Sequence, residues 1–169
     1  QIKNITIHSH DEAIRRTDKK GPLLTRAARD HCLQYIVAVG LLRGTLELDD
    51  YLDTMANTPE IDYLRDKMVL IENPQFSQDH HNISIRSCAN AIQIEMQDGQ
   101  LSELVQIDFP MGDPIHRHKV ESAITQKFHT LTRAYWDEEK REKIIQLFKN
   151  EDILLSMSVI DFMHTLVNC

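Results

Sequence analysis

The stretch from Arg26 to Arg43 constrains the fold of this chain more than any other segment. Between Cys32 and Leu42 the only strongly polar side chain is that of Gln34. A helix that is apolar on nearly every side is stable only when it is buried, so other elements must pack around it. Thr25 can cap its N-terminus, and Gly44 suits the position just past its end. The sequence therefore predicts a long buried helix over residues 26–43.

Alternating apolar and polar side chains predict several strands. Residues 2–8 alternate over a short stretch, and residues 68–71 form a short apolar run. The clearest alternation runs over residues 92–97 and again over 104–109, with the turn pair Asp98-Gly99 between them. This pattern predicts a β-hairpin. Because one face of each hairpin strand is apolar and the other polar, we expect a sheet that is covered on one side only.

The segments between these elements are weaker signals. Two short helices are expected over residues 48–55 and 60–67, separated by Thr58-Pro59, because proline favours a helix start. Residues 72–87 contain Asn73-Pro74 and a polar run, so we expect an irregular connection there.

After Pro110 the pattern becomes helical, with apolar side chains at spacings of three and four. The first of these helices carries Val120, Ile124, Phe128, Leu131 and Tyr135. Asp137 can cap a second helix, and Ser158 with Asp161 resembles the capping box of a third. A helical segment of about 50 residues is marginally stable by itself, so we expect it to pack on a part of the protein that lies outside this sequence.

These elements predict an α+β fold with a division near residue 115. Residues 1–115 are expected to form an α+β domain with an antiparallel sheet and packed helices, and residues 116–169 a helical segment. The sequence begins at Gln1 and enters a strand pattern at once. We interpret it as part of a longer polypeptide.

The composition disfavours several classes of partner. The formal net charge is -7, from 19 basic and 26 acidic residues, and no basic run is present, which disfavours nucleic acid. No apolar run approaches the ~20 residues that span a bilayer, which disfavours a membrane. Cys32, Cys88 and Cys169 are far apart and predict neither a disulfide framework nor a zinc site. Reduced cysteines in a cytoplasmic protein are the simplest interpretation.

His31, Gln34 and Tyr35 form the first candidate site. Their spacings of three and four place them on one face of the predicted helix. Polar groups on a buried helix need partners or a wet cleft. The spacing alone leaves open whether this face binds a substrate or fixes the packing of the helix.

Histidine pairs and two arginines are the remaining candidates. Three histidine pairs could each share a metal: His8 with His10, His80 with His81, and His116 with His118. No further ligand stands at a recognised spacing from any of them. We therefore predict surface or loop histidines and no metal site.

Arg86 lies in a loop ahead of the hairpin and could bind a carboxylate. Arg117 lies in the stretch GDPIHRHK over residues 112–119, which could hold an anion or could simply be a solvated loop. Neither a nucleophile elbow nor a glycine-rich phosphate loop is present in the sequence.

The string DKKGPLLTRAARDHCLQYIVAVGLLRGTLELDDY over residues 18–51 resembles the MmgE/PrpD family, and within it the dehydratases. RDHCLQY is its most specific part. The resemblance continues through IDYLRDKM at 61–68, ENPQF at 72–76, ANAIQIEMQDG at 89–99 and FPMGD at 109–113. It extends over essentially the whole chain.

This resemblance implies a fold and an activity. The family combines a large all-helical domain with a smaller α+β lid domain, so the N-terminal helical domain of the same protein would be a partner, and a homodimer is expected. The implied reaction is loss of water from a small tricarboxylic acid, 2-methylcitrate, to give 2-methyl-cis-aconitate in propionate breakdown. The family works without an iron–sulfur cluster, and no cofactor is expected. There are two alternatives. The first is a sibling activity such as cis-aconitate decarboxylation, and the second is a non-catalytic dimerisation module.

The resemblance also implies roles for individual residues. Tyr35 matches the tyrosine that lines the family's cleft, so Tyr35 is the first candidate for catalysis and His31 the second. Gln34, Arg86 and Arg117 are candidates for substrate binding. The stretch over residues 112–119 departs from the dehydratase pattern, in which more arginines are expected after the glycine.

Overall fold

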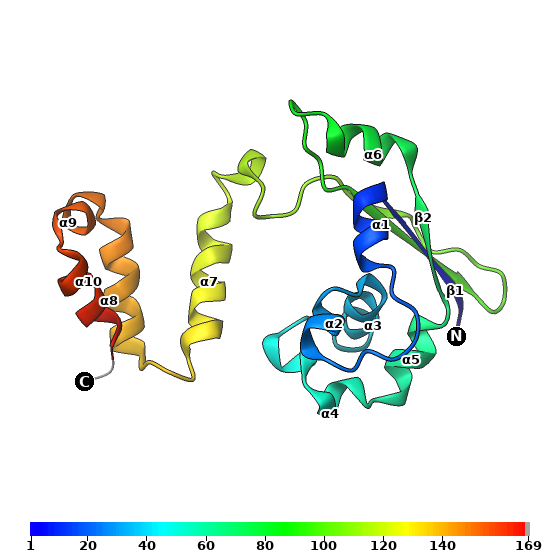
Figure 1. The fold of residues 1–169 in the computed structure, drawn as a ribbon, viewed down its shortest axis with the longest axis horizontal. Coiled ribbons are helices and arrows are strands. Elements are labelled where there is room, and N and C mark those ends of the chain that lie inside the picture. Colours follow the sequence, from blue (N-terminus) through cyan, green and yellow to red (C-terminus); the bar gives the residue numbers. More distant parts are fainter. Residues whose placement is uncertain (168–169) are drawn as a thin grey trace. The chain divides into compact units, whose positions relative to one another are not determined.

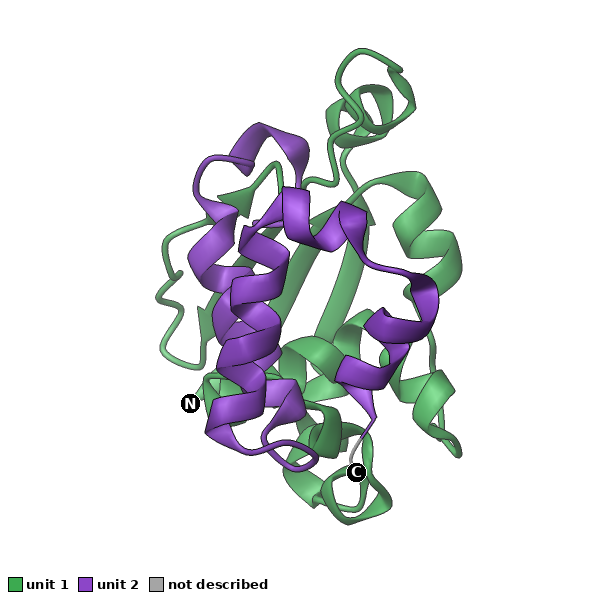
Figure 2. Ribbon diagram, turned by 90° about the vertical axis from the view of Figure 1, so that its left-hand side faces the viewer, with its two compact units in different colours: residues 1–110 green, residues 111–169 purple. Residues whose placement is uncertain are grey.

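A computed structural model describes residues 1–167 of the chain. Two compact units are present: unit 1 comprises residues 1–110, and unit 2 begins at residue 111 (Figure 2). Unit 1 contains a sheet with helices and unit 2 is helical, which confirms the α+β class. That the two units belong to different domains of a longer enzyme stays a prediction.

Unit 1 is built on a four-stranded sheet with the order β2-β1-β3-β4. Its strands are β1 (Ile2–Ser9), β2 (Met68–Glu72), β3 (Asn90–Met96) and β4 (Val105–Ile107). The β3–β4 hairpin is antiparallel, as predicted, and β3 also pairs antiparallel with β1. Strands β1 and β2 are parallel, so the sheet is mixed and not purely antiparallel. Gly99 in the hairpin turn has a φ of 87°, a conformation that glycine adopts without strain.

Unit 1 also contains helices, some of which pack against one face of the sheet (Figure 1). In chain order they are α1 (Asp11–Thr17), α2 (Arg26–Asp30), α3 (Leu33–Arg43), η1 (Leu48–Tyr51), α4 (Asp53–Ala56), α5 (Pro59–Arg65) and α6 (Pro74–His81). Helices α3 and α5 supply most of the buried contacts to the strands.

The core of unit 1 lies between the sheet and α3 and α5. In register, Ile5 faces Met68 on β2 and Ile94 on β3, which puts these three side chains on the covered face. The full set of buried core residues is Ile5, Ile7, Cys32, Tyr35, Ala38, Val39, Ile61, Leu64 and Met68. Thr6 and Gln93 pair on the opposite face and are only partly buried. The apolar face of β1 and β3 is thus covered, as the alternation predicts, whereas Val105 and Ile107 on β4 are exposed.

The predicted long helix is interrupted. Thr25 caps α2 through a hydrogen bond from the Ala28 N–H (3.1 Å), and Gly44 ends α3 with a φ of 71°, so both ends are confirmed. His31 and Cys32, however, leave helical geometry between α2 and α3. The polar α2 lies beside the core whereas α3 lies within it, and one straight helix cannot satisfy both positions. The sequence shows no glycine or proline at this point to signal the break.

The prediction of an irregular connection over residues 72–87 is wrong in part, because α6 occupies its centre. Asn73 accepts a hydrogen bond from the Gln75 N–H (3.0 Å), and Pro74 is the first helical residue. Phe76 on α6 is buried against Ala89 and Ala91. Asn-Pro here is a helix start and not a turn.

Unit 2 contains η2 (Pro114–His116), α7 (Val120–Thr132), α8 (Glu138–Lys149), α9 (Glu151–Ser156) and α10 (Val159–Leu166). Asp137 caps α8 and Ser158 caps α10, as predicted. Among its described residues only Ile144 and Ile145 are buried. Cys169 lies outside the described residues.

No helix within residues 1–167 is both long and apolar enough to cross a membrane.

Candidate active site

Tyr35, the first candidate for catalysis, is a core residue of unit 1. Its side chain is 1% exposed, and its hydroxyl donates a hydrogen bond to the main-chain carbonyl of Asp50 (2.5 Å). Its ring lies 6.2 Å from that of Tyr51. Burial raises the pKa of the Tyr35 phenol above its usual value of 10, so the group keeps its proton at neutral pH and acts as a donor.

The carbonyl that Tyr35 binds is itself held in place. The Asp50 side chain is fully buried, accepts a hydrogen bond from the Glu47 N–H (2.7 Å) and pairs with Arg43. These contacts fix η1 at the end of α3. The Tyr35 hydroxyl therefore stabilises the packing of η1 on α3 in this structure.

The expectation that His31, Gln34 and Tyr35 share one helical face is wrong, because the helix breaks between His31 and Gln34. The His31 side chain is 64% exposed, and its Nδ1 lies 3.0 Å from the Ala27 carbonyl oxygen. Gln34 is buried; its amide donates to the Asp18 carboxylate and its oxygen accepts from the Cys32 thiol (3.3 Å). Catalytic or binding roles for these residues stay predictions that depend on family likeness alone.

A cleft of about 300 Å³ opens beside the Tyr35 ring. It is lined by two arginines, two aspartates, an asparagine, the tyrosine and a short apolar wall, namely Arg29, Arg65, Asp53, Asp62, Asn57, Tyr35, Pro22, Leu23, Leu24 and Ala56. This cleft is the candidate active-site region of unit 1, and we call it the arginine cleft.

Arg29 lies at the end of α2 and is 5% exposed. Its Nε donates to the Leu23 carbonyl (3.1 Å), its Nη1 donates to the Tyr51 carbonyl (2.7 Å), and its Nη2 pairs with Asp53 (2.7 Å). The guanidinium thus joins the 21–24 loop to η1. Sequence reasoning missed Arg29, although a charged residue inside a helix predicted to be buried was a usable signal.

Arg65 ends α5 and is 9% exposed. Its Nη2 donates to the Gly21 carbonyl (2.9 Å) and lies 3.5 Å from the Lys19 carbonyl oxygen, and its Nη1 pairs with Asp62 (2.5 Å). Its Nε is buried and has no hydrogen-bond partner among the described residues. Arg65 was also missed, although it stands in the IDYLRDKM string.

The aspartates that pair with these arginines are on the surface. Asp53 is 81% and Asp62 65% exposed, in contrast to the nearly buried guanidinium groups. Guanidinium groups bind carboxylates well because their paired N–H groups match the two carboxylate oxygens. The arginine cleft is therefore chemically suited to hold a small organic acid through its guanidinium groups.

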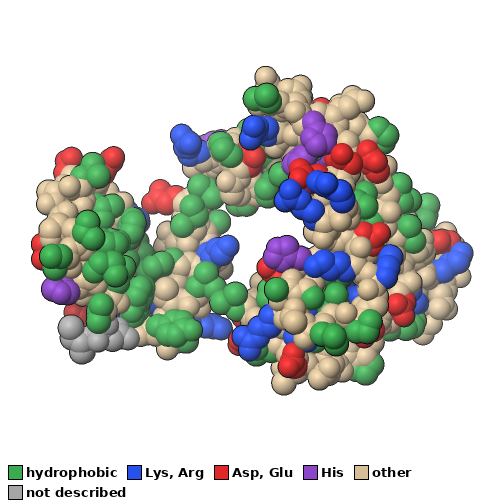
Figure 3. Space-filling model, in the orientation of Figure 1, with side chains coloured by type: hydrophobic (Ala, Val, Ile, Leu, Met, Phe, Trp, Pro, Cys, Tyr) green, Lys and Arg blue, Asp and Glu red, His purple; other side chains and the backbone are tan. Residues whose placement is uncertain are grey.

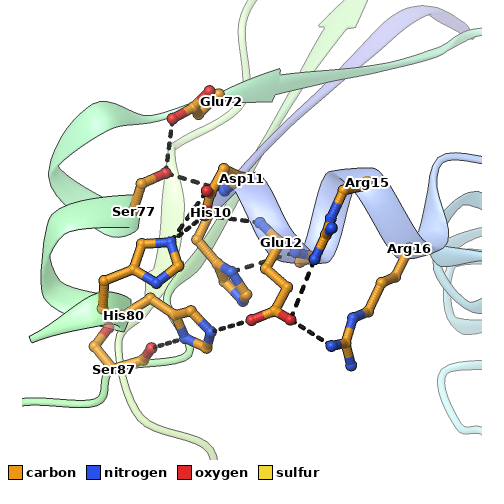
Figure 4. Close-up of polar contacts among 11 residues, drawn as sticks. His10, Asp11, Glu12, Arg15, Arg16, Glu72, Ser77, His80 and Ser87 are labelled. Carbon is orange, nitrogen blue, oxygen red and sulfur yellow. Dashed lines mark hydrogen bonds and ion pairs between the residues drawn. The ribbon is translucent and has the colours of Figure 1, made fainter. Parts of the chain in front are cut away.

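A second polar cluster joins α1 to α6, and we call it the histidine cluster: His10, Asp11, Glu12, His80 and His81. The His10 and His80 rings stack at 3.7 Å between centroids (Figure 4). His80 contacts the Ser87 carbonyl oxygen (2.9 Å) and the Glu12 carboxylate (3.2 Å), and His81 contacts Asp11 (2.9 Å). Histidine, acidic and basic side chains gather on the surface near α1 and α6 (Figure 3). The prediction of surface or loop histidines is wrong for His10, which is buried, and it missed this cluster.

The contacts of the histidine cluster set the protonation of its members. Burial, and next the neighbouring His80, lower the pKa of His10, so its Nδ1 is free to accept the Ala13 N–H (3.2 Å) that caps α1. A hydrogen bond from His81 lowers the pKa of Asp11, and one from His80 lowers the pKa of Glu12. The contacts of His80 and His81 with Glu12 and Asp11 fasten α6 to α1, which is a structural role. In the described part of the chain, no three His, Cys, Asp or Glu side chains are arranged to hold a metal.

The remaining two candidates lie elsewhere. Arg86 is exposed in the loop after α6, has a φ of 52°, and donates its main-chain N–H to the Asn82 carbonyl (2.8 Å). It does not line the arginine cleft. Arg117 follows η2 in unit 2 and is exposed. Substrate binding by either arginine stays a prediction.

The fold defines the class of protein: a small α+β domain with an arginine-lined cleft, followed by helices of incomplete burial. The chain belongs to the MmgE/PrpD family, because the sequence model of the MmgE/PrpD C-terminal domain matches residues 1–152. This confirms the resemblance found in the sequence.

Several curated relatives are similar to this chain over two thirds of its length or nearly all of it. The mitochondrial 2-methylcitrate dehydratase of Yarrowia lipolytica is 39% identical over 153 residues, which cover 90% of this chain and 29% of the relative. The 2-methylcitrate dehydratase of Escherichia coli K12 is 36% identical over 166 residues, which cover 98% of this chain and 34% of the relative. The 2-methylcitrate dehydratase-like protein oryR of Aspergillus oryzae is 41% identical over 115 residues, which cover 66% of this chain and 23% of the relative. The chain spans about a third of the length of the dehydratases it matches.

Proposed function

We propose that this chain is the C-terminal part of a 2-methylcitrate dehydratase, a hydro-lyase. The observation that carries the proposal is identity of 36–39% with dehydratases over 90–98% of the chain. In the reaction a base removes a proton from carbon, the hydroxyl group leaves with a proton from an acid, and the products are 2-methyl-cis-aconitate and water. No iron–sulfur cluster or other cofactor is part of this proposal.

The residues of this chain would contribute binding and orientation. The arginine cleft supplies guanidinium groups for carboxylates, and Tyr35 supplies a protonated phenol beside them. For Tyr35 to act on the leaving hydroxyl, its own hydroxyl must first release the Asp50 carbonyl. The remaining catalytic groups would come from the N-terminal helical domain, so we expect the 169-residue chain alone to be inactive.

The test is an assay of the full-length protein with 2-methylcitrate, following the ultraviolet absorbance of the unsaturated product. Turnover is expected with the full-length protein and not with the 169-residue chain. Tyr35→Phe should lower kcat markedly while the far-ultraviolet circular dichroism stays unchanged. Absence of any turnover by a folded full-length protein on 2-methylcitrate would refute the proposal.

A sibling activity is the second candidate. The relative with the highest identity among the three is named only "dehydratase-like", and residues 112–119 depart from the dehydratase pattern. Release of carbon dioxide from cis-aconitate, without reaction on 2-methylcitrate, would favour a decarboxylase. A stable dimer without turnover on any tricarboxylate would instead favour a dimerisation module.

We also propose a homodimer as the working form, which the family resemblance implies. Size-exclusion chromatography with light scattering of the full-length protein tests it. A cytoplasmic location also stays a proposal, and the Yarrowia relative is named mitochondrial. Fractionation of cells that express the full-length protein would decide between the two compartments.

A further inference from the structure

We propose that Arg65 in the arginine cleft is a carboxylate-binding residue, and that a ligand carboxylate displaces Asp62 from it. The ligand class is a small di- or tricarboxylic acid. This inference rests on the proposed function, because it assigns part of the substrate to a named side chain.

The ion pair that the ligand would replace is easy to exchange. Asp62 is 65% exposed whereas the Arg65 side chain is 9% exposed. An exposed carboxylate gains little from such a pair, because water solvates it almost as well. A ligand carboxylate held inside the cleft would meet the same guanidinium with less competing water, and charge-assisted hydrogen bonds are strongest there. The exchange therefore favours the ligand.

Arg65 is already held in the orientation that binding requires. The carbonyl oxygens of Lys19 and Gly21 both lie within 3.5 Å of its Nη2. These contacts hold the guanidinium in place when the Asp62 carboxylate leaves it. Gly21 presents its carbonyl from a backbone with a φ of 77°, which favours glycine. A donor fixed in advance loses little side-chain entropy when a ligand binds.

One donor of Arg65 is unused. Its Nε is buried without a hydrogen-bond partner in the described chain, although buried donors are normally paired. Arg29, in contrast, uses Nε, Nη1 and Nη2 on three different partners. Within the described chain Arg65 therefore has protein partners for its two terminal nitrogens only, whereas all three nitrogens of Arg29 are used.

The size and lining of the cleft fit a small acid. Its volume of about 300 Å³ lies at the lower end of the range for small-molecule sites. Asn57 adds a polar side chain to the lining, while Leu23 and Leu24 form an apolar wall. A cleft of this volume and lining suits a compact acid.

The experiment measures binding of tricarballylate, a tricarboxylate without the leaving hydroxyl, to the ¹⁵N-labelled 169-residue chain by nuclear magnetic resonance titration. Saturable shifts are expected at residues 21–24 and 57–65. Arg65→Gln should weaken binding about tenfold. Arg16→Gln is the matched control, because it also removes one cation from unit 1 but lies on α1, where it pairs with Glu12. It should leave binding unchanged.

Asp62→Asn is the decisive variant, because it removes the competing carboxylate without touching Arg65. It should strengthen binding about threefold if Asp62 is displaced. It also keeps the test valid if Arg65→Gln fails to fold. Unchanged or weaker binding by Asp62→Asn, equal losses in Arg65→Gln and Arg16→Gln, or no saturable shifts would each overturn the inference.

Failure of this inference can be told apart from failure of the proposed function. Turnover of 2-methylcitrate by the full-length protein, with normal tricarballylate binding in both cleft variants, would leave the function standing and remove Arg65 from it. Binding that follows the predicted pattern, in a protein whose full-length form shows no dehydratase activity, would keep the carboxylate site and remove the function.

Discussion

Unit 1 and unit 2 both contain capped helices, but only unit 1 has an extensive core. In unit 1 the sheet, α3 and α5 bury residues such as Ile5, Val39 and Ile61 completely. In unit 2, Ile144 and Ile145 are the only buried residues among those described, and Val159 on α10 is 78% exposed. Amphipathic helices with good caps are therefore not sufficient for a core, because each apolar face needs a second layer to cover it.

This difference agrees with the proposal that unit 2 completes a larger helical domain. Its exposed apolar side chains would then be covered by the N-terminal helices of the same protein. Unit 1, which covers its own core, would be the part that can move or bind as an independent body. The following predictions test this contrast, starting with the largest expected effect.

Separation of the two units should give the largest effect. Residues 1–110 should unfold cooperatively on heating, because their core is contained within them. Residues 111–169 should melt without a cooperative transition and bind a hydrophobic dye, because a chain of that size with so small a core is marginal. Circular dichroism measures the unfolding transitions of the two fragments, and dye fluorescence measures their exposed apolar surface. A cooperative, monomeric transition of the 111–169 segment would break the contrast.

Matched isoleucine substitutions should show the same contrast at single positions. Ile5→Ala should lower the free energy of unfolding by about 2–5 kcal/mol, because it leaves a cavity in the core. Ile160→Ala in α10, where the side chain is exposed, should change it by less than about 0.5 kcal/mol. Urea titration followed by circular dichroism measures both. Equal effects would show that unit 2 is better packed than described above.

Tyr35→Phe should have an intermediate effect. Loss of the hydroxyl leaves the Asp50 carbonyl without this donor in a buried position, at a cost of about 1–3 kcal/mol. Tyr63→Phe is the control, because that phenol is exposed, and it should cost much less. Full stability of Tyr35→Phe would mean that the hydroxyl is not committed to Asp50 and is available to a substrate.

The pH dependence of unit 1 should show the smallest effect. The pKa of His10 is lowered in the folded state, so the unfolded state binds more protons below pH 6.5. Stability is therefore full above pH 6.5 and falls as the pH drops from there through the folded-state pKa. The lowered pKa values of Asp11 and Glu12 add a further loss, at lower pH, as the pH falls below their ordinary values.

His10→Asn isolates the first of these pH effects, because asparagine also caps a helix but does not titrate. Thermal unfolding of residues 1–110 between pH 8 and pH 5 is the measurement. The variant should lose less stability than the parent over this window. Identical pH profiles would exclude His10 as the cause.

Several features were determined by the sequence itself. The strand alternation around β1, β3 and β4, and the caps at Thr25, Gly44 and Asp137, were predicted correctly. These signals are local: alternation depends on side chains two residues apart, and a cap depends on an N–H two or three residues away. They are therefore readable without knowledge of the fold.

Other features were decided only by the tertiary structure. The break at His31 and Cys32 arises because α3 enters the core while α2 stays beside it. The contact of Glu12 with His80 joins residues 68 apart in the chain, and that of Arg65 with Gly21 joins residues 44 apart. No local pattern encodes such pairs, because which side chains meet depends on how the sheet and its helices pack. The arginine cleft therefore became visible only in three dimensions, as did the burial of the Tyr35 hydroxyl, which the helical spacing had left open.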